Sequence, residues 1–149
     1  MKKLLCILLF CLSFTYTFSW MVDDIRDEFG DKTGEKEVIL ISKNKVMSIR
    51  KIFDSRYAIC YIDGNKNFIE EKKEQIVKVK IDNLKSFKLK RTRAYYDYGF
   101  IGMITSQELN LLANGKIAKF SMPQYDGTHC IIIVDLTGLK SSIKKTKWE

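Results

Sequence analysis

The sequence predicts a small, mainly β domain, an antiparallel β-sandwich or barrel with one short helix. Three observations support this fold class. Apolar and charged residues alternate along much of the chain, turn-forming Asp-Gly pairs separate apolar runs, and one segment has a clear helical pattern. An α+β arrangement, with the helix packed against one sheet, is the alternative that these observations leave open.

The alternation is clearest in the stretch QIVKVKID. Val77, Val79 and Ile81 fall on one face of an extended chain, whereas Lys78 and Lys80 fall on the other. This period of two is typical of half-buried strands, and SFKLKRTR continues it. Further strands are expected at 37–42, 46–53 and 56–62.

Two turn signals predict hairpins. An Asp-Gly-Asn turn at 63–65 lies between apolar runs, so residues 56–62 and 67–70 are expected to pair. The Asp-Gly pair at 126–127 is expected to join the two apolar runs on either side of it. The later run includes 131–134, which is apolar without alternation. Such a run predicts a central strand with both faces covered.

One helix is predicted at 105–115. Thr105 precedes Glu108 by three residues, which is the spacing of a capping box. Leu109, Leu111 and Leu112 supply a buried side, and Gly115 suits the C-terminal end of a helix. The lysine-rich tail is expected to form a final frayed turn or helix with a basic end.

The first 19 residues have the pattern of a cleaved secretory signal. Two lysines precede an apolar run at 4–12, which is shorter than the roughly 20 residues that a membrane span needs. Thr17 and Ser19 suit a cut before Trp20. The predicted location is therefore the periplasm, the cell envelope or the extracellular medium. Lipid anchoring at Cys11 is a lesser alternative.

Removal of this segment leaves residues 20–149, which are enough for a single β-rich domain without a transmembrane span. This domain carries 24 basic and 18 acidic residues. A net charge of that size suits solubility and permits acidic partners.

An acidic segment opens the expected domain. Residues 20–37 carry a net charge of −4, and residues 38–149 carry +10. A calcium loop needs regularly spaced oxygens, but Phe29 occupies the third position of a loop starting at Asp27. We therefore expect no metal, and instead Asx-type turns leading into the first strand, with carboxylates solvated or facing the basic body. The candidate acidic segment comprises Asp23, Asp24, Asp27, Glu28 and Asp31.

Cys60 and Cys130 remain after the predicted cleavage, each within an apolar run. In an oxidising compartment they are a candidate disulfide. Their spacing sets no distance between them, so two separate buried thiols are the alternative.

The sequence offers few groups for catalysis. His129 is the only histidine, and it adjoins Cys130 on a predicted strand, where neighbouring side chains point to opposite faces. The G-x-S-x-G and H-E-x-x-H motifs and a phosphate-binding glycine loop are absent from the sequence. We therefore expect no enzyme and no cofactor. A hydrolase with two distant carboxylates is the remaining catalytic hypothesis.

The stretch KLKRTRAYYDYGF is the candidate binding surface. Interleaved cations and aromatic rings bind phosphate-bearing ligands by ion pairs and stacking, but the predicted export argues against nucleic acid. The expected partner is a protein or an anionic envelope component. A strand with a charged outer face, running into the edge of the core, is the alternative. The surface comprises Lys88, Lys90, Arg91, Arg93, Tyr95, Tyr96 and Tyr98.

Two short motifs lie near the ends of the expected domain. Trp20 is followed by D-x-F-G-D-x-T-G, and an apolar strand is followed by D-x-x-G-L. In these motifs the chain resembles a group of small exported bacterial proteins of unknown function. The resemblance implies export and a compact β domain, and it carries over no catalytic residues. The residues that match are Trp20, Asp27, Phe29, Gly30, Asp31, Thr33, Gly34, Asp135, Gly138 and Leu139.

These features predict an exported protein that acts by binding, or as an accessory component of the envelope, without catalysis. A secreted effector or inhibitor of a host or competitor protein is the second hypothesis. A hydrolase is the third.

Overall fold

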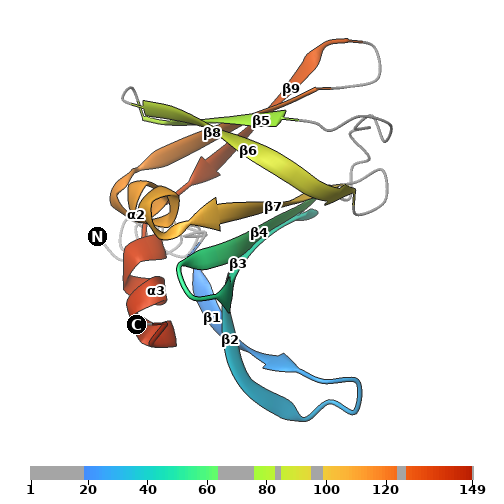
Figure 1. The fold of residues 1–149 in the computed structure, drawn as a ribbon, viewed down its shortest axis with the longest axis vertical. Coiled ribbons are helices and arrows are strands. Elements are labelled where there is room, and N and C mark those ends of the chain that lie inside the picture. Colours follow the sequence, from blue (N-terminus) through green and yellow to red (C-terminus); the bar gives the residue numbers. More distant parts are fainter. Residues whose placement is uncertain (1–18, 64–75, 83–84, 95–98, 124–126, 149) are drawn as a thin grey trace, which may run out of the picture.

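Nine antiparallel strands and two helices make up the part of the chain that the computed structural model describes, residues 19–63, 76–82, 85–94, 99–123 and 127–148. The strands form one sheet in the order β1-β2-β3-β4-β7-β6-β5-β8-β9, and the helices pack against each other at one end of it (Figure 1). The elements are β1 (Met21–Arg26), β2 (Lys32–Ser42), β3 (Lys45–Phe53), β4 (Arg56–Asp63), β5 (Ile76–Ile81), β6 (Lys85–Ala94), β7 (Gly99–Thr105), α2 (Ser106–Asn114), β8 (Ile117–Pro123), β9 (His129–Asp135) and α3 (Leu139–Thr146).

Strand β6 allows this sheet to fold over on itself. Its first part pairs with β5 and its last part with β7, and a β-bulge lies between Arg91 and Arg93. Because a bulge bends a strand and increases its twist, β5, β8 and β9 fold over the layer formed by β2, β3, β4 and β7 (Figure 1). The mainly β sandwich that the sequence predicts is therefore confirmed.

The hydrophobic core lies between the two layers. Phe100 of β7 and Phe120 of β8 are fully buried, and their ring centroids lie 6.0 Å apart. Tyr61 of β4 stacks on Phe100 with a centroid distance of 5.9 Å. Along β5, Val77, Val79 and Ile81 are buried and the two lysines between them are exposed, as the alternation predicts.

The two hairpin predictions have different outcomes. Strands β8 and β9 pair antiparallel around Gly127, which confirms the second hairpin. The predicted central position of β9 is wrong, because β9 is an edge strand with Ile131 and Ile133 54% and 65% exposed. An apolar run alone does not distinguish a strand covered on both faces from one with an apolar outer face. In the first predicted hairpin, the strand at 56–62 is present as β4. Its expected partner, residues 67–70, lies outside the described residues.

Trp20 joins the two edges of the sheet. Its side chain is only 3% exposed, and the indole Nε1–H donates a hydrogen bond to the backbone oxygen of Asp135, at the end of β9, over 2.9 Å. The Ser142 hydroxyl on α3 donates to the backbone oxygen of Trp20 over 2.8 Å. The start of β1 is thereby fastened to both the last strand and the last helix.

Helix α2 begins with the predicted capping box. The hydroxyl oxygen of Thr105 accepts a hydrogen bond from the backbone N–H of Glu108, and the Glu108 carboxylate accepts one from the backbone N–H of Thr105. Leu109 and Leu112 are buried. The tail forms a second helix, α3, and neither of these helices is long and apolar enough to cross a membrane.

Replacing Thr105 by alanine should lower the free energy of unfolding by about 1 kcal/mol, because the Glu108 N–H loses its acceptor. Urea unfolding followed by circular dichroism measures this change. Thr105→Ser keeps the hydroxyl and should retain most of the stability. Equal unfolding midpoints for all three proteins would contradict a contribution from the cap.

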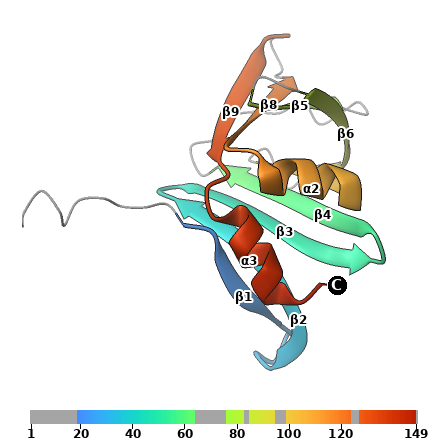
Figure 2. The ribbon, with the colours of Figure 1, turned by 90° about the vertical axis from the view of Figure 1, so that its left-hand side faces the viewer.

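The acidic segment is the outer part of a projecting hairpin, and the prediction that it leads into the first strand is wrong. Strand β2 pairs with β3 only from Glu37 onward, whereas it pairs with β1 as far out as Lys32. The outer part of the β1–β2 hairpin therefore has no third strand beside it among the described residues, and it projects from the body (Figures 1 and 2). At the tip, Asp27 Oδ1 accepts hydrogen bonds from the N–H groups of Phe29 and Asp31, which forms a predicted Asx turn.

The tip carboxylates are solvated and do not face the basic body. Asp27, Glu28 and Asp31 are exposed, and the ring of Phe29 between them is 82% exposed. Nearer the body, Asp24 pairs with Lys32 of the same hairpin at 2.5 Å, and this hydrogen bond lowers the pKa of Asp24. Within the described ranges, no group of three or more His, Cys, Asp or Glu residues is placed to hold a metal ion.

Cys60 and Cys130 are not bonded to each other, so the candidate disulfide is not formed. Tyr61 points into the core, close to Cys130 of β9. Its neighbour Cys60 points to the opposite face of β4, near Glu37 and Arg50, where burial raises the pKa of the thiol. The two thiols therefore lie on opposite sides of the β4 layer.

Candidate binding cleft

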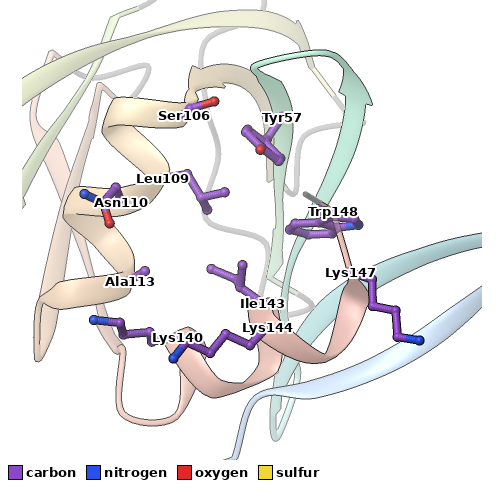
Figure 3. A pocket seen from close by; sticks show the side chains of 10 residues that line it. All are labelled: Tyr57, Ser106, Leu109, Asn110, Ala113, Lys140, Ile143, Lys144, Lys147 and Trp148. Atoms are coloured by element: carbon purple, nitrogen blue, oxygen red, sulfur yellow. The ribbon is translucent and has the colours of Figure 1, made fainter.

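A cleft of about 640 Å³ lies between α2 and α3 and reaches down to β4 (Figure 3). This volume falls within the range of roughly 300–1,000 Å³ that is typical of small-molecule sites. The described residues that line it are Tyr57, Ser106, Leu109, Asn110, Ala113, Lys140, Ile143, Lys144, Lys147 and Trp148.

The floor of the cleft is apolar and aromatic. Leu109 points into it from α2, Ile143 from α3, and Tyr57 from β4 (Figure 3). The ring of Trp148 packs against that of Tyr57, with centroids 5.5 Å apart and an angle of 44° between the planes. Aromatic rings of this kind offer a large contact area and lose little conformational entropy on binding.

The end of α3 positions Trp148. Lys147, the C-cap residue, has a left-handed backbone conformation with φ 57° and ψ 40°. A left-handed residue commonly ends a helix and turns the chain aside. The backbone oxygen of Trp148 then accepts a hydrogen bond from Lys51 Nζ of β3 over 2.7 Å, which holds the indole over β4.

Three lysines form one side of the cleft. Lys140 and Lys144 are four residues apart, so they lie along one side of α3, and Lys147 follows as the C-cap residue. Lys140 Nζ donates a hydrogen bond to Asn114 Oδ1 over 2.6 Å, which ties α3 to the end of α2. Figure 3 shows Lys140 and Lys144 at the edge of the opening and the Lys147 ammonium pointing outward. No carboxylate is found among the described residues that line the cleft, so its electrostatic potential favours anions.

No protein-family model and no curated protein matches the chain. The fold has a solved counterpart. The structure is similar to the crystal structure of invasion associated protein B from Bartonella henselae, with a TM-score of 0.65 and 15% sequence identity. The similarity covers 87% of this chain and 92% of that chain. At this identity it shows a shared fold alone.

The cleft has the chemistry of a binding site. Its lysines can pair with an anionic group while its floor covers an apolar one, so it fits a ligand that carries both. Ser106 and Tyr57 supply hydroxyl groups. The described lining contains no histidine, cysteine or carboxylate side chain that would activate these hydroxyls.

The predicted basic-aromatic surface lies elsewhere. Lys88 is exposed on β6, and the backbone of Lys90, Arg91 and Arg93 continues along that strand. The side chains of 90–94 and all of residues 95–98 lie outside the described part of the structure, so a binding role for this surface stays a prediction.

Sequence reasoning missed the cleft, although one signal for it was present. The lysine spacing in the tail, with Ile143 between two of the lysines, predicts a helix that is basic along one side. The contribution of Tyr57 has no sequence signal, because it depends on how the end of the chain after α3 brings Trp148 against β4.

Proposed function

We propose that this chain is an exported binding protein, an accessory component of the cell envelope that does not act by catalysis. The observation that carries the proposal is the cleft between α2 and α3, where lysines stand beside an aromatic and aliphatic floor. The partner that fits is a protein segment with an acidic residue next to an apolar side chain. Tryptophan and tyrosine are enriched at the energetic centres of such interfaces.

Export is supported by the secretory pattern of the first 19 residues and by the resemblance of the two end motifs to small exported bacterial proteins. A role without catalysis is supported by the chemistry of the cleft lining. Mass spectrometry of the N-terminus of the protein purified from cells tests the cleavage before Trp20 and also detects lipid on Cys11.

A secreted effector or inhibitor is the second candidate function. It is favoured by the name of the protein with the similar fold, which is described as invasion associated. Fractionation of cells distinguishes the two candidates, because an accessory protein stays with the envelope and an effector accumulates in the culture medium.

Reversing charge in the cleft should abolish partner capture. In pull-downs from envelope extract, we expect Lys144→Glu with Lys147→Glu to recover at least about tenfold less partner than the wild type. The matched control is Lys43→Glu with Lys145→Glu, which changes the net charge equally at exposed residues that do not line the cleft. Equal capture by both double variants would contradict the proposed site.

Trp148 provides a second measurement of the same site. The chain has two tryptophans, and Trp20 is buried away from the cleft lining. Partner binding should therefore change the fluorescence of Trp148, and Trp148→Phe should remove that change.

A further inference from the structure

The outer face of β6, β5, β8 and β9 combines lysines with exposed isoleucines. Lys78 and Lys80 of β5, Lys88 of β6 and Lys119 of β8 are all exposed on it. Inward-facing residues of the same strands, such as Val79, pack into the core, so this outer face points away from the rest of the molecule.

The strand register places the lysines directly against one another. Lys78 lies opposite Lys88, and Lys80 lies opposite Lys119. Like charges directly opposite on neighbouring strands destabilise a sheet. None of the four pairs with a carboxylate among the residues that the structure describes. Folding alone therefore gives no reason for this arrangement, whereas an anionic partner would.

Apolar side chains continue the same face toward its edge. Ile131 lies opposite Ser121, and Ile133 lies opposite Lys119, so both isoleucines point outward beside the lysines. They are 54% and 65% exposed on a strand at the edge of the sheet. Ile76 of β5, which is 47% exposed, points to the same side as Lys78.

We infer that this face binds the surface of an anionic lipid bilayer. Lysines near such a surface are attracted to the headgroup phosphates, each by about fivefold in affinity. Exposed apolar side chains beside them can enter the boundary between headgroups and acyl chains. A soluble polyanion would use the lysines but would leave Ile131 and Ile133 in water, so the isoleucines favour the bilayer. The inference concerns a different surface from the cleft and does not depend on it.

Vesicle co-sedimentation tests the inference. The protein is produced with its own leader, and its N-terminus is established by mass spectrometry, so that every variant carries the same terminus. The probes are vesicles of phosphatidylglycerol and phosphatidylcholine in equal parts, vesicles of phosphatidylcholine alone, and dextran sulfate as a soluble polyanion. We expect binding to the anionic vesicles that is weak on the neutral ones and falls steeply with added salt.

Two double variants separate the two components of the face. Lys78→Glu with Lys119→Glu should weaken binding to anionic vesicles by at least about tenfold. Ile131→Ser with Ile133→Ser should weaken vesicle binding by about tenfold and leave binding to dextran sulfate unchanged. The controls are Lys43→Glu with Lys145→Glu, and Ile41→Ser with Phe53→Ser, which change exposed residues elsewhere. Thermal unfolding confirms that each variant is folded.

Three results would overturn the inference. The first is equal binding of the wild type to anionic and neutral vesicles. The second is a lysine double variant that binds as its control does. The third is an isoleucine double variant that keeps full vesicle binding, which would make the face a site for soluble polyanions.

Discussion

Replacing Trp20 by alanine should lower the free energy of unfolding by about 3–5 kcal/mol. The substitution removes a large ring that is 3% exposed and leaves a cavity between β1, β9 and α3. It also removes the indole N–H that donates to the backbone oxygen of Asp135. Because β1 and β9 are the two edges of the sheet, both should become easier to unfold.

Urea unfolding measures this loss, and Trp20→Phe separates its two components. Phenylalanine keeps most of the buried apolar area but cannot donate to Asp135. The free energy of unfolding of this variant should therefore fall by about 1–2 kcal/mol more than the loss of contact area alone predicts. Amide hydrogen exchange on β1 and β9 should increase in both variants. A change of less than about 1 kcal/mol for Trp20→Ala would show that the sheet edges hold together without this residue.

Replacing Gly99 by alanine should lower the free energy of unfolding by about 3 kcal/mol. A Cβ atom at Gly99 would overlap the backbone carbonyl of Tyr61 on the neighbouring strand β4. A carbonyl within a strand ladder cannot move unless the hydrogen bonds between the strands lengthen or break. β4 and β7 would therefore have to separate locally. This position is next to Phe100, at the centre of the core.

Gly102 of the same strand provides the comparison. A Cβ there would approach the side chain of Leu89, with a distance of 2.6 Å to its Cγ. A leucine side chain can shift more readily than a backbone carbonyl, so Gly102→Ala should cost less, about 1–2 kcal/mol. Denaturant midpoints of the two variants decide between these costs. Equal losses would mean that the backbone at Gly99 relaxes as readily as the Leu89 side chain.

Local patterns in the sequence predicted the elements that are determined locally. The alternation at Val77 and Val79 identifies β5, and the spacing of Thr105 and Glu108 identifies the start of α2, because each depends on residues close together in the chain. The Asp-Gly pair before Thr128 likewise identifies the β8–β9 hairpin.

Features that depend on distant segments were missed or wrongly predicted. The apolar run around Ile131 and Ile133 does not reveal which strands lie beside β9. It therefore could not show that β9 is at the edge of the sheet. The cleft requires Tyr57 and Trp148 to meet, although they are distant in the sequence. The prediction for the acidic segment was wrong for a similar reason: the segment projects because β2 stops pairing with β3 at Glu37, although β3 itself continues to Phe53 beside β4.

The projecting hairpin gives the molecule an electric dipole moment. Its tip, with Asp27, Glu28 and Asp31, lies at the opposite end of the molecule from β5 and β8, which carry Lys78 and Lys119 (Figure 1). In the field of a negatively charged surface, such a dipole turns the lysines toward the surface and the hairpin away from it. The field extends only about 10 Å at an ionic strength of 0.1 M. At low salt the protein should therefore be oriented before it makes contact, with the Phe29 ring presented on the side that faces away from the surface.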